Sequence, residues 1–136
     1  MINNDIKIEK EGNFEDFQNY GLYILRFKTK IYIGCAYDET IAQRIKEHVL
    51  HSVNGTTPKD KQLRDEGGCK AEVLYILPKP RCSVSKRKKL IKQLESYLIY
   101  KCGHSILEQL FDIDVVDETL LAYKEIISEY MLNSQY

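Results

Sequence analysis

The sequence predicts one α+β domain, because strand and helix patterns alternate along its 136 residues without a linker or repeat between them. The clearest strand pattern lies at residues 20–35, where two runs of aromatic and branched side chains flank the polar tip 28–30, as in a β-hairpin. Residues 69–77 alternate and then become apolar, which indicates a third strand. We expect helices to flank these strands.

Two helices are predicted between the hairpin and the third strand. Thr40 and Gln43 fit a capping box, in which each side chain bonds the other residue's backbone N–H, and they predict a helix to about residue 51. A short polar helix follows at residues 58–66, with a proline at its start and glycine after its end.

Two longer helices are predicted in the second half of the chain. Ser83 or Ser85 would cap a helix that continues to about residue 102. Within the C-terminal segment 111–136, an amphipathic helix is expected at residues 115–132. That helix would pack either on the same domain or on a partner, including a second copy.

The remaining organisation is simple. Residues 19–110 form the main domain, and residues 1–18 form a polar extension whose strong apolar anchors are Phe14 and Phe17. Lys plus Arg (20) balance Asp plus Glu (20), so a polyanionic partner would have to be met by a local patch. Without an apolar run long enough to span a bilayer or an apolar core at the start, a cytoplasmic protein is expected, with no membrane partner.

The cysteines show no spacing typical of a metal site or a disulfide framework. The four cysteines stand alone, without a C-x-x-C pair, so reduced thiols are expected and a disulfide framework is not. Cys102 and His104 would ligate a metal only together with distant cysteines.

The facing of two hairpin tyrosines depends on the turn between them. A two-residue turn at Lys28-Thr29 pairs Tyr23 with Gly34 and puts Tyr23 and Tyr32 on one face, whereas a three-residue turn separates them. Lys-Thr lacks the Asn-Gly chemistry that two-residue turns favour. Spacing leaves both arrangements open, and simple packing in the sheet is the alternative to a functional role.

Polar side chains of two predicted helices are candidates for chemistry. Arg44 and His48 are four residues apart and share a helix face, where they offer a permanent cation and a group that titrates near neutrality. A solvated helix face is the simpler interpretation. Glu95 falls on the apolar arc of the long helix, so it needs an Arg partner, a metal ion or a cleft at the edge of the core.

The first turn of that long helix also carries a basic cluster. It is either a solvated helix end or a surface for a phosphate backbone. The cluster comprises Lys86, Arg87, Lys88 and Lys89.

Together these residues resemble the motifs of the GIY-YIG endonuclease superfamily, over about residues 20–108. The matching features are GLY at 21–23, YIG at 32–34, Arg44, His48 and Glu95. The resemblance implies a small three-stranded antiparallel sheet flanked by helices, here with an extra C-terminal helix. It also implies that both tyrosines lie on the active face.

The resemblance further implies metal-dependent hydrolysis of DNA. Glu95 would hold one Mg²⁺ or Mn²⁺ ion, and Arg44 would bind the scissile phosphate. The candidates for proton acceptor and relay are Tyr23, Tyr32 and His48. A homodimer through the last helix would suit cleavage of both strands.

Nucleic-acid contacts would come from Lys30 at the hairpin tip and from the basic cluster, and a solvated tip lysine is the alternative for Lys30. Two positions depart from the family pattern: Cys35 follows YIG, and Glu108 stands near the place of a frequent asparagine. The alternative function is a degenerate GIY-YIG-like module that binds nucleic acid or a protein partner without cutting. The third possible function is that of a plain interaction domain whose tyrosines lie in the core.

Overall fold

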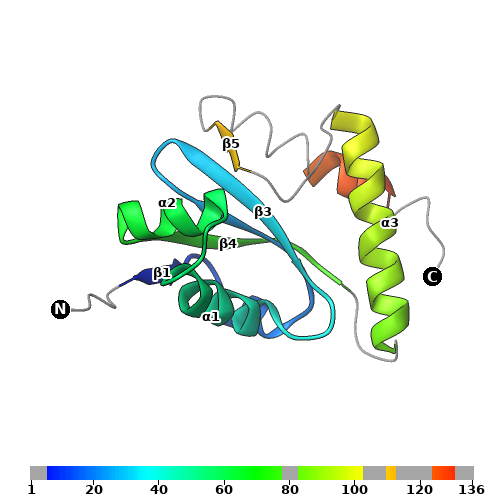
Figure 1. Cartoon of the computed structure of the whole chain (residues 1–136). Coiled ribbons are helices and arrows are strands. Elements are labelled where there is room, and N and C mark those ends of the chain that lie inside the picture. Colours follow the sequence, from blue (N-terminus) through cyan, green and yellow to red (C-terminus); the bar gives the residue numbers. More distant parts are fainter. Residues whose placement is uncertain (1–5, 78–82, 103–109, 113–123, 131–136) are drawn as a thin grey trace.

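The computed structural model describes residues 6–77, 83–102, 110–112 and 124–130, and its fold is α+β, as predicted (Figure 1). Five strands form one mixed sheet in these residues, in the order β1-β4-β2-β3-β5. The strands are β1 (Lys7–Lys10), β2 (Gly21–Arg26), β3 (Lys30–Ala36), β4 (Gly68–Ile76) and β5 (Leu110–Asp112). The helices are η1 (Phe14–Gln18, a 3₁₀ turn), α1 (Ile41–Ser52), α2 (Pro58–Glu66) and α3 (Val84–Cys102), and residues 124–130 are also helical.

The expected three-stranded antiparallel sheet is wrong in its extent. The three predicted strands β4, β2 and β3 do pair antiparallel, but β1 adds parallel to β4 and β5 adds antiparallel to β3. β1 has the sequence KIEK and alternates exposed with half-buried residues. Its charged side chains suit the edge of a sheet, and because of them the sequence shows no apolar strand pattern here. β1 and η1 both lie in the segment 1–18, where Phe17 is fully buried and Phe14 is exposed.

The hairpin has the two-residue turn. The Phe27 N–H donates to the Lys30 carbonyl oxygen at 2.8 Å, and Tyr23 lies opposite Gly34. A contact with α2 supports this turn, since the backbone N–H of Lys28 donates to Oε1 of Glu66 at 2.9 Å. Tyr23 and Tyr32 therefore share a face, and the three-residue alternative is wrong.

Helix boundaries follow the predicted signals closely. The capping box of α1 is present: Thr40 Oγ1 accepts from the Gln43 N–H at 3.2 Å, and the Thr40 N–H donates to Gln43 Oε1 at 2.8 Å. Pro58 begins α2, and Gly67 ends it in the left-handed conformation at φ +69°. Ser83 rather than Ser85 caps α3.

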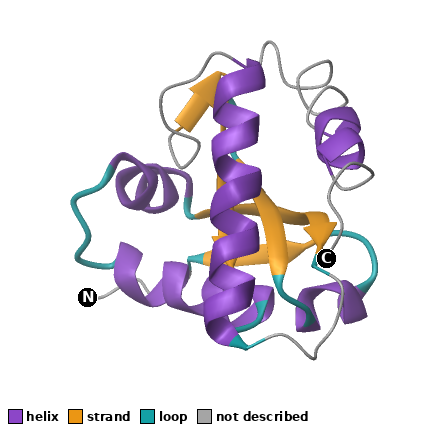
Figure 2. Ribbon diagram, turned by 90° about the vertical axis from the view of Figure 1, so that its right-hand side faces the viewer, coloured by secondary structure: helices purple, strands orange, loops and turns teal. Residues whose placement is uncertain are grey.

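Helices cover both faces of the sheet, with a separate apolar cluster on each side. Figure 2 shows α3 lying across one face in front of the strands. The cluster on the α3 side consists of Leu22, Ile24, Ile31, Ile33, Cys35, Leu74, Leu77, Ile91, Leu94, Leu98 and Ile127. The cluster beneath α1 and α2 consists of Phe17, Tyr23, Leu25, Phe27, Tyr32, Ala36, Ile41, Ile45, Leu63 and Ala71. Both hairpin tyrosines thus belong to the α1/α2 layer.

The predicted C-terminal helix is described only at residues 124–130, and the rest of it lies outside the described residues. Ile127 is buried in the cluster beneath α3, and the ring of Tyr130 lies 5.1 Å from that of Tyr97 on α3. This helical piece therefore packs on the same domain. Among the described residues, no helix has the length and apolar character needed to cross a bilayer.

Candidate active site

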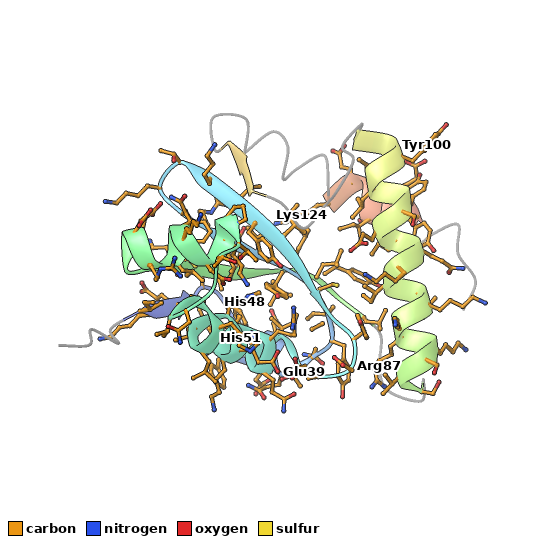
Figure 3. The ribbon with its side chains drawn as sticks, in the orientation of Figure 1. Glu39, His48, His51, Arg87, Tyr100 and Lys124 are labelled. Atoms are coloured by element: carbon orange, nitrogen blue, oxygen red, sulfur yellow. The ribbon has the colours of Figure 1, made fainter. Side chains whose placement is uncertain are left out.

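A buried hydrogen bond joins the sheet to α1. The hydroxyl oxygen of Tyr23 on β2 lies 2.5 Å from Nε2 of His48 on α1. Tyr23 is 0% exposed and His48 is 3% exposed. Figure 3 shows His48 on the side of α1 that faces the strands. His48 is thus a core residue with a polar partner, and the simpler interpretation of a solvated helix face is wrong for it.

Tyr32 completes an aromatic setting around this histidine. Its ring centroid lies 5.5 Å from that of His48 with the planes at 80°, and the Tyr23 ring lies 5.7 Å away at 60°. Both are edge-on arrangements, which aromatic rings favour. The structure therefore brings three of the predicted site residues together.

The two glycines that mirror each other in the hairpin have different roles. A Cβ on Gly34 would lie 2.5 Å from the Tyr23 hydroxyl oxygen, so the missing side chain makes room for the phenol. A Cβ on Gly21 would lie 1.9 Å from the backbone oxygen of Tyr75 on β4, and Gly21 has φ +152°. Only Gly34 borders the tyrosine–histidine pair, whereas Gly21 allows close approach of two strands.

Arg44 lies one turn before His48 and is partly exposed. Its Nη1 is 3.1 Å from Oε1 of Glu47 and 3.8 Å from Oε1 of Glu39. Its Nε is buried and finds no hydrogen-bond partner among the described residues. The pKa of Arg44 is raised overall: burial lowers it, but Tyr23 beside the guanidinium, Tyr32 and Glu47 raise it more. Arg44 therefore stays cationic next to the buried phenol.

A cavity of about 400 Å³ opens beside Arg44. Its other lining residues are Cys35, Tyr37, Asp38, Glu39, Glu47 and Lys92. The pKa of Glu39 is raised by burial and by Glu47 next to it. Carboxylates thus crowd the cavity wall around one arginine, and Arg44 connects the cavity to the buried tyrosine–histidine pair.

Burial controls the protonation of the pair. The pKa of Tyr23 is raised well above its usual value, first by burial and then by Tyr32, although Arg44 lowers it. The pKa of His48 is lowered from 6.5 to about 3 by burial and by the charges of Lys59, Arg44 and His51. At neutral pH the pair therefore consists of a phenol and an uncharged imidazole.

No protein family, curated protein or solved structure matches this chain.

Sequence reasoning missed Lys59 near the start of α2. Its Nζ lies 2.6 Å from Nδ1 of His48 and 5.5 Å from the centroid of the Tyr32 ring. A signal was present, because Leu63 is the one apolar residue in the polar run of α2 and marks its inward face. Lys59 lies one helical turn before Leu63 and so shares that face.

Glu95 does have a cationic partner. Its Oε1 lies 3.6 Å from Nζ of Lys92, and the Glu95 side chain is 19% exposed. Lys92 in turn lines the cavity that Arg44 lines. The acid on the apolar arc of α3 is therefore linked through Lys92 to the edge of that cavity.

In the described part of the chain, no group of three or more His, Cys, Asp or Glu side chains could hold a metal ion. A magnesium site with one carboxylate ligand and water molecules as the other ligands does not need three such side chains. For the pair Cys102 and His104, the Cys102 side chain and all of His104 lie outside the described residues.

The basic cluster of α3 divides into two kinds of residue. Lys86, Lys88 and Lys89 are exposed. Arg87 is 9% exposed, its guanidinium lies 4.1 Å from the centroid of the Tyr20 ring, and its Nε donates to the Tyr37 carbonyl oxygen at 2.7 Å. Figure 3 shows Arg87 reaching from the first turn of α3 toward the loop between β3 and α1.

Lys30 begins β3 directly after the hairpin turn and is partly buried. Glu108, the position that departs from the asparagine of the family pattern, lies outside the described residues. Cys35, the other departure, is buried in the α3-side cluster and also lines the Arg44 cavity.

Proposed function

We propose that this protein is a metal-dependent endonuclease that hydrolyses DNA phosphodiester bonds through a GIY-YIG-like active site. The observation that carries the proposal is the convergence of Tyr23, Tyr32 and His48 on one buried point, with Arg44 between that point and a cavity. A strand hairpin and a helix supply these side chains in the order that the family resemblance implies.

The central part of the sheet also supports this assignment. β4, β2 and β3 form an antiparallel unit between α1 on one face and α3 on the other. This is the arrangement that the resemblance implies, and β1 and β5 extend it at the edges. We accordingly propose that this α+β fold is of the GIY-YIG type.

Arg44 binds the scissile phosphate. Its guanidinium is forked and permanently charged, which suits a phosphate oxygen pair. In the free protein this charge contacts the carboxylates of Glu47 and Glu39. A DNA phosphate entering the cavity replaces those contacts, and the guanidinium then stabilises the charge that builds up on phosphorus-bound oxygens during hydrolysis.

Tyr23, Tyr32 and His48 form the proton-handling group. A phenol hydrogen-bonded to an imidazole is suited to hold or move the proton of an attacking water. Tyr23 is closed off from solvent in the free protein. Movement of Arg44 toward phosphate removes the side chain that separates the phenol from the cavity, and so admits water to it.

Glu95 would hold the single Mg²⁺ or Mn²⁺ ion. The fit rests on hard oxygen donors: Oε1 of Glu95 lies 3.6 Å from Nζ of Lys92, which lines the cavity, and the carboxylates of Asp38, Glu39 and Glu47 line the cavity wall. Those carboxylates would repel a phosphate unless a cation offset them. When bound, the ion would act as a Lewis acid on a phosphate oxygen.

The DNA backbone on either side of the cleaved bond is met by lysines. Lys86, Lys88 and Lys89 project into solvent from the first turn of α3, and Lys30 lies at the hairpin end. Because the chain as a whole is neutral, binding by such a local patch would depend strongly on salt.

The alternative is a catalytically degenerate GIY-YIG-like module that binds nucleic acid or a protein partner without cutting. Complete burial of Tyr23 and near-complete burial of His48 favour it, because a packed phenol and imidazole also serve the core. The two functions differ in whether a bound DNA strand is broken.

Cleavage assays separate the two functions. Supercoiled plasmid, branched DNA and single-stranded DNA are incubated with wild type in Mg²⁺, Mn²⁺ or EDTA, and with Glu95→Ala beside Glu125→Ala as an exposed-acid control. The proposal predicts metal-dependent cutting that Glu95→Ala loses and Glu125→Ala keeps. Binding of DNA by folded wild type without cutting in any metal would establish the alternative instead.

A further inference from the structure

Lys59 makes a contact that constrains the protons of the site. Its Nζ lies 2.6 Å from Nδ1 of His48, and the other ring nitrogen of His48 lies 2.5 Å from the Tyr23 hydroxyl oxygen. Lysine, histidine and tyrosine thus form a continuous line from α2 through α1 to β2. Both ends of the imidazole are engaged.

The lysine end determines which nitrogen carries the proton. An ammonium group has hydrogens to donate and no lone pair, so Nδ1 of His48 must accept from Lys59. A neutral imidazole has a single N–H, which is then at Nε2. His48 accordingly donates to Tyr23, and the hydroxyl proton of Tyr23 must point to another acceptor.

The surroundings of Lys59 favour its charged form. Nζ lies 3.4 Å from Oδ1 of the buried Asp60, and it lies 5.5 Å from the centroid of the Tyr32 ring. Gly55 leaves the space that this carboxylate needs, since a Cβ there would lie 1.9 Å from Oδ2 of Asp60. An anion and an aromatic face therefore hold an ammonium group in place.

We propose that Lys59 is a positioning residue that fixes His48 as a hydrogen-bond donor to Tyr23, which removes His48 from the candidates for general base. The role in catalysis rests on the proposed nuclease function, whereas the tautomer does not. A tyrosine that takes a proton from the attacking water must then pass its own hydroxyl proton to an acceptor other than His48. The Nε2–H of His48 and the charge of Arg44 stabilise negative charge that develops on the Tyr23 hydroxyl oxygen during this transfer.

The groups that face His48 come from several elements, and all bear on its protonation. They are Tyr23 on β2, Tyr32 on β3, Arg44 and His51 on α1, and Lys59 on α2. Each is either uncharged or cationic at neutral pH, so none of them favours a protonated imidazole.

The direct test is the tautomer of His48 in the wild-type protein. Long-range ¹H–¹⁵N correlation spectra at neutral pH report it, and the His48→Gln spectrum assigns its signals. We expect the Nε2–H form, with Nδ1 accepting a hydrogen bond. An Nδ1–H form or an imidazolium at neutral pH would overturn the inference. This measurement uses no DNA, so it stands or fails separately from nuclease activity.

Variants of α2 test the cause of the tautomer. Lys59→Met removes the donor at similar length, Lys59→Arg keeps a donor, and Lys61→Met changes an exposed lysine of the same helix. We expect Lys59→Met to lose the fixed Nε2–H form, and the other two variants to keep it. An unchanged tautomer in Lys59→Met would contradict the proposal.

Kinetics distinguish positioning from direct DNA binding. The Lys59 side chain is 15% exposed and its Nζ is engaged by His48, so we do not expect it to bind DNA directly. Lys59→Met should lower kcat by about 10- to 100-fold, as removal of an orienting partner does, and leave KM for DNA unchanged. A raised KM with unchanged kcat would show that Lys59 binds phosphate, against the proposal. Recovery of kcat in Lys59→Arg is expected.

Discussion

The hydroxyl oxygen of Tyr23 lies 2.5 Å from Nε2 of His48, and this bond ties the centre of the sheet to the inward face of α1. Both side chains are excluded from bulk water. A buried polar group that loses its partner retains the cost of desolvation, so the bond matters for stability as well as for chemistry.

Tyr23→Phe should therefore lower the free energy of unfolding. Removal of the hydroxyl leaves Nε2 of the buried His48 without its partner, which costs about 1–3 kcal/mol. Urea unfolding measures the change, with Tyr100→Phe as the control because Tyr100 is 81% exposed. Equal stability of the two variants would mean that the buried bond contributes nothing.

Gly34→Ala should displace the Tyr23 ring. The new methyl group would lie 2.5 Å from the end of the phenol, so the ring must move or the strands must separate. A cost of about 1–3 kcal/mol is expected, as for overpacking elsewhere. In a Tyr23→Leu background the shorter side chain leaves room, and the same Gly34→Ala change should cost less. Additive losses in this cycle would argue against the contact.

The free energy of unfolding should decrease as the pH is lowered through the range in which His48 would protonate. Its pKa is about 3 in the folded protein against an ordinary 6.5, so the unfolded chain binds this proton first as the pH decreases. Above about pH 6.5 the group has no effect, and between pH 6.5 and 3 it costs about 1 kcal/mol per pH unit.

Unfolding free energies measured across that range test the histidine assignment. His48→Gln should reduce the slope, whereas His51→Gln, which changes an exposed residue with the smallest effect on the His48 pKa, should retain most of it. Identical slopes for both variants and wild type would show that His48 is not the group responsible.

The basic cluster of α3 should separate into a structural and a DNA-binding part. Arg87→Met loses the contact with Tyr20 and the bond to the Tyr37 carbonyl, so about 1–2 kcal/mol of stability should be lost. Lys89→Met should leave stability unchanged and reduce the salt dependence of DNA binding by about one phosphate contact. The opposite pattern would exclude the proposed surface.

Local signals in the sequence accounted for most of the described elements. The capping box at Thr40 and the proline and glycine that bound α2 specify their helix ends through backbone geometry and hydrogen bonds, which depend on neighbouring residues alone. The edge strand β1 was missed because its alternation consists mainly of charges. The turn at Lys28-Thr29 was undecided because a distant residue, Glu66, supports it.

The site was predictable only in part, because contacts between residues far apart in the sequence also determine it. Helical spacing put Arg44 and His48 on one face, but it did not reveal that His48 is buried against Tyr23. Lys59 looked like one of several lysines in a polar helix, and its contact with His48 follows from how α2 packs on α1. Long-range packing of this kind has no local sequence pattern.

The most direct test of nuclease function is plasmid nicking in Mg²⁺ by wild type, Arg44→Met and Lys46→Met. Arg44 borders both the cavity and the buried phenol, whereas Lys46 is exposed on the same helix. We predict nicking by wild type and Lys46→Met and its loss in folded Arg44→Met. Nicking that Arg44→Met retains, or none by folded wild type, would contradict the proposed active site.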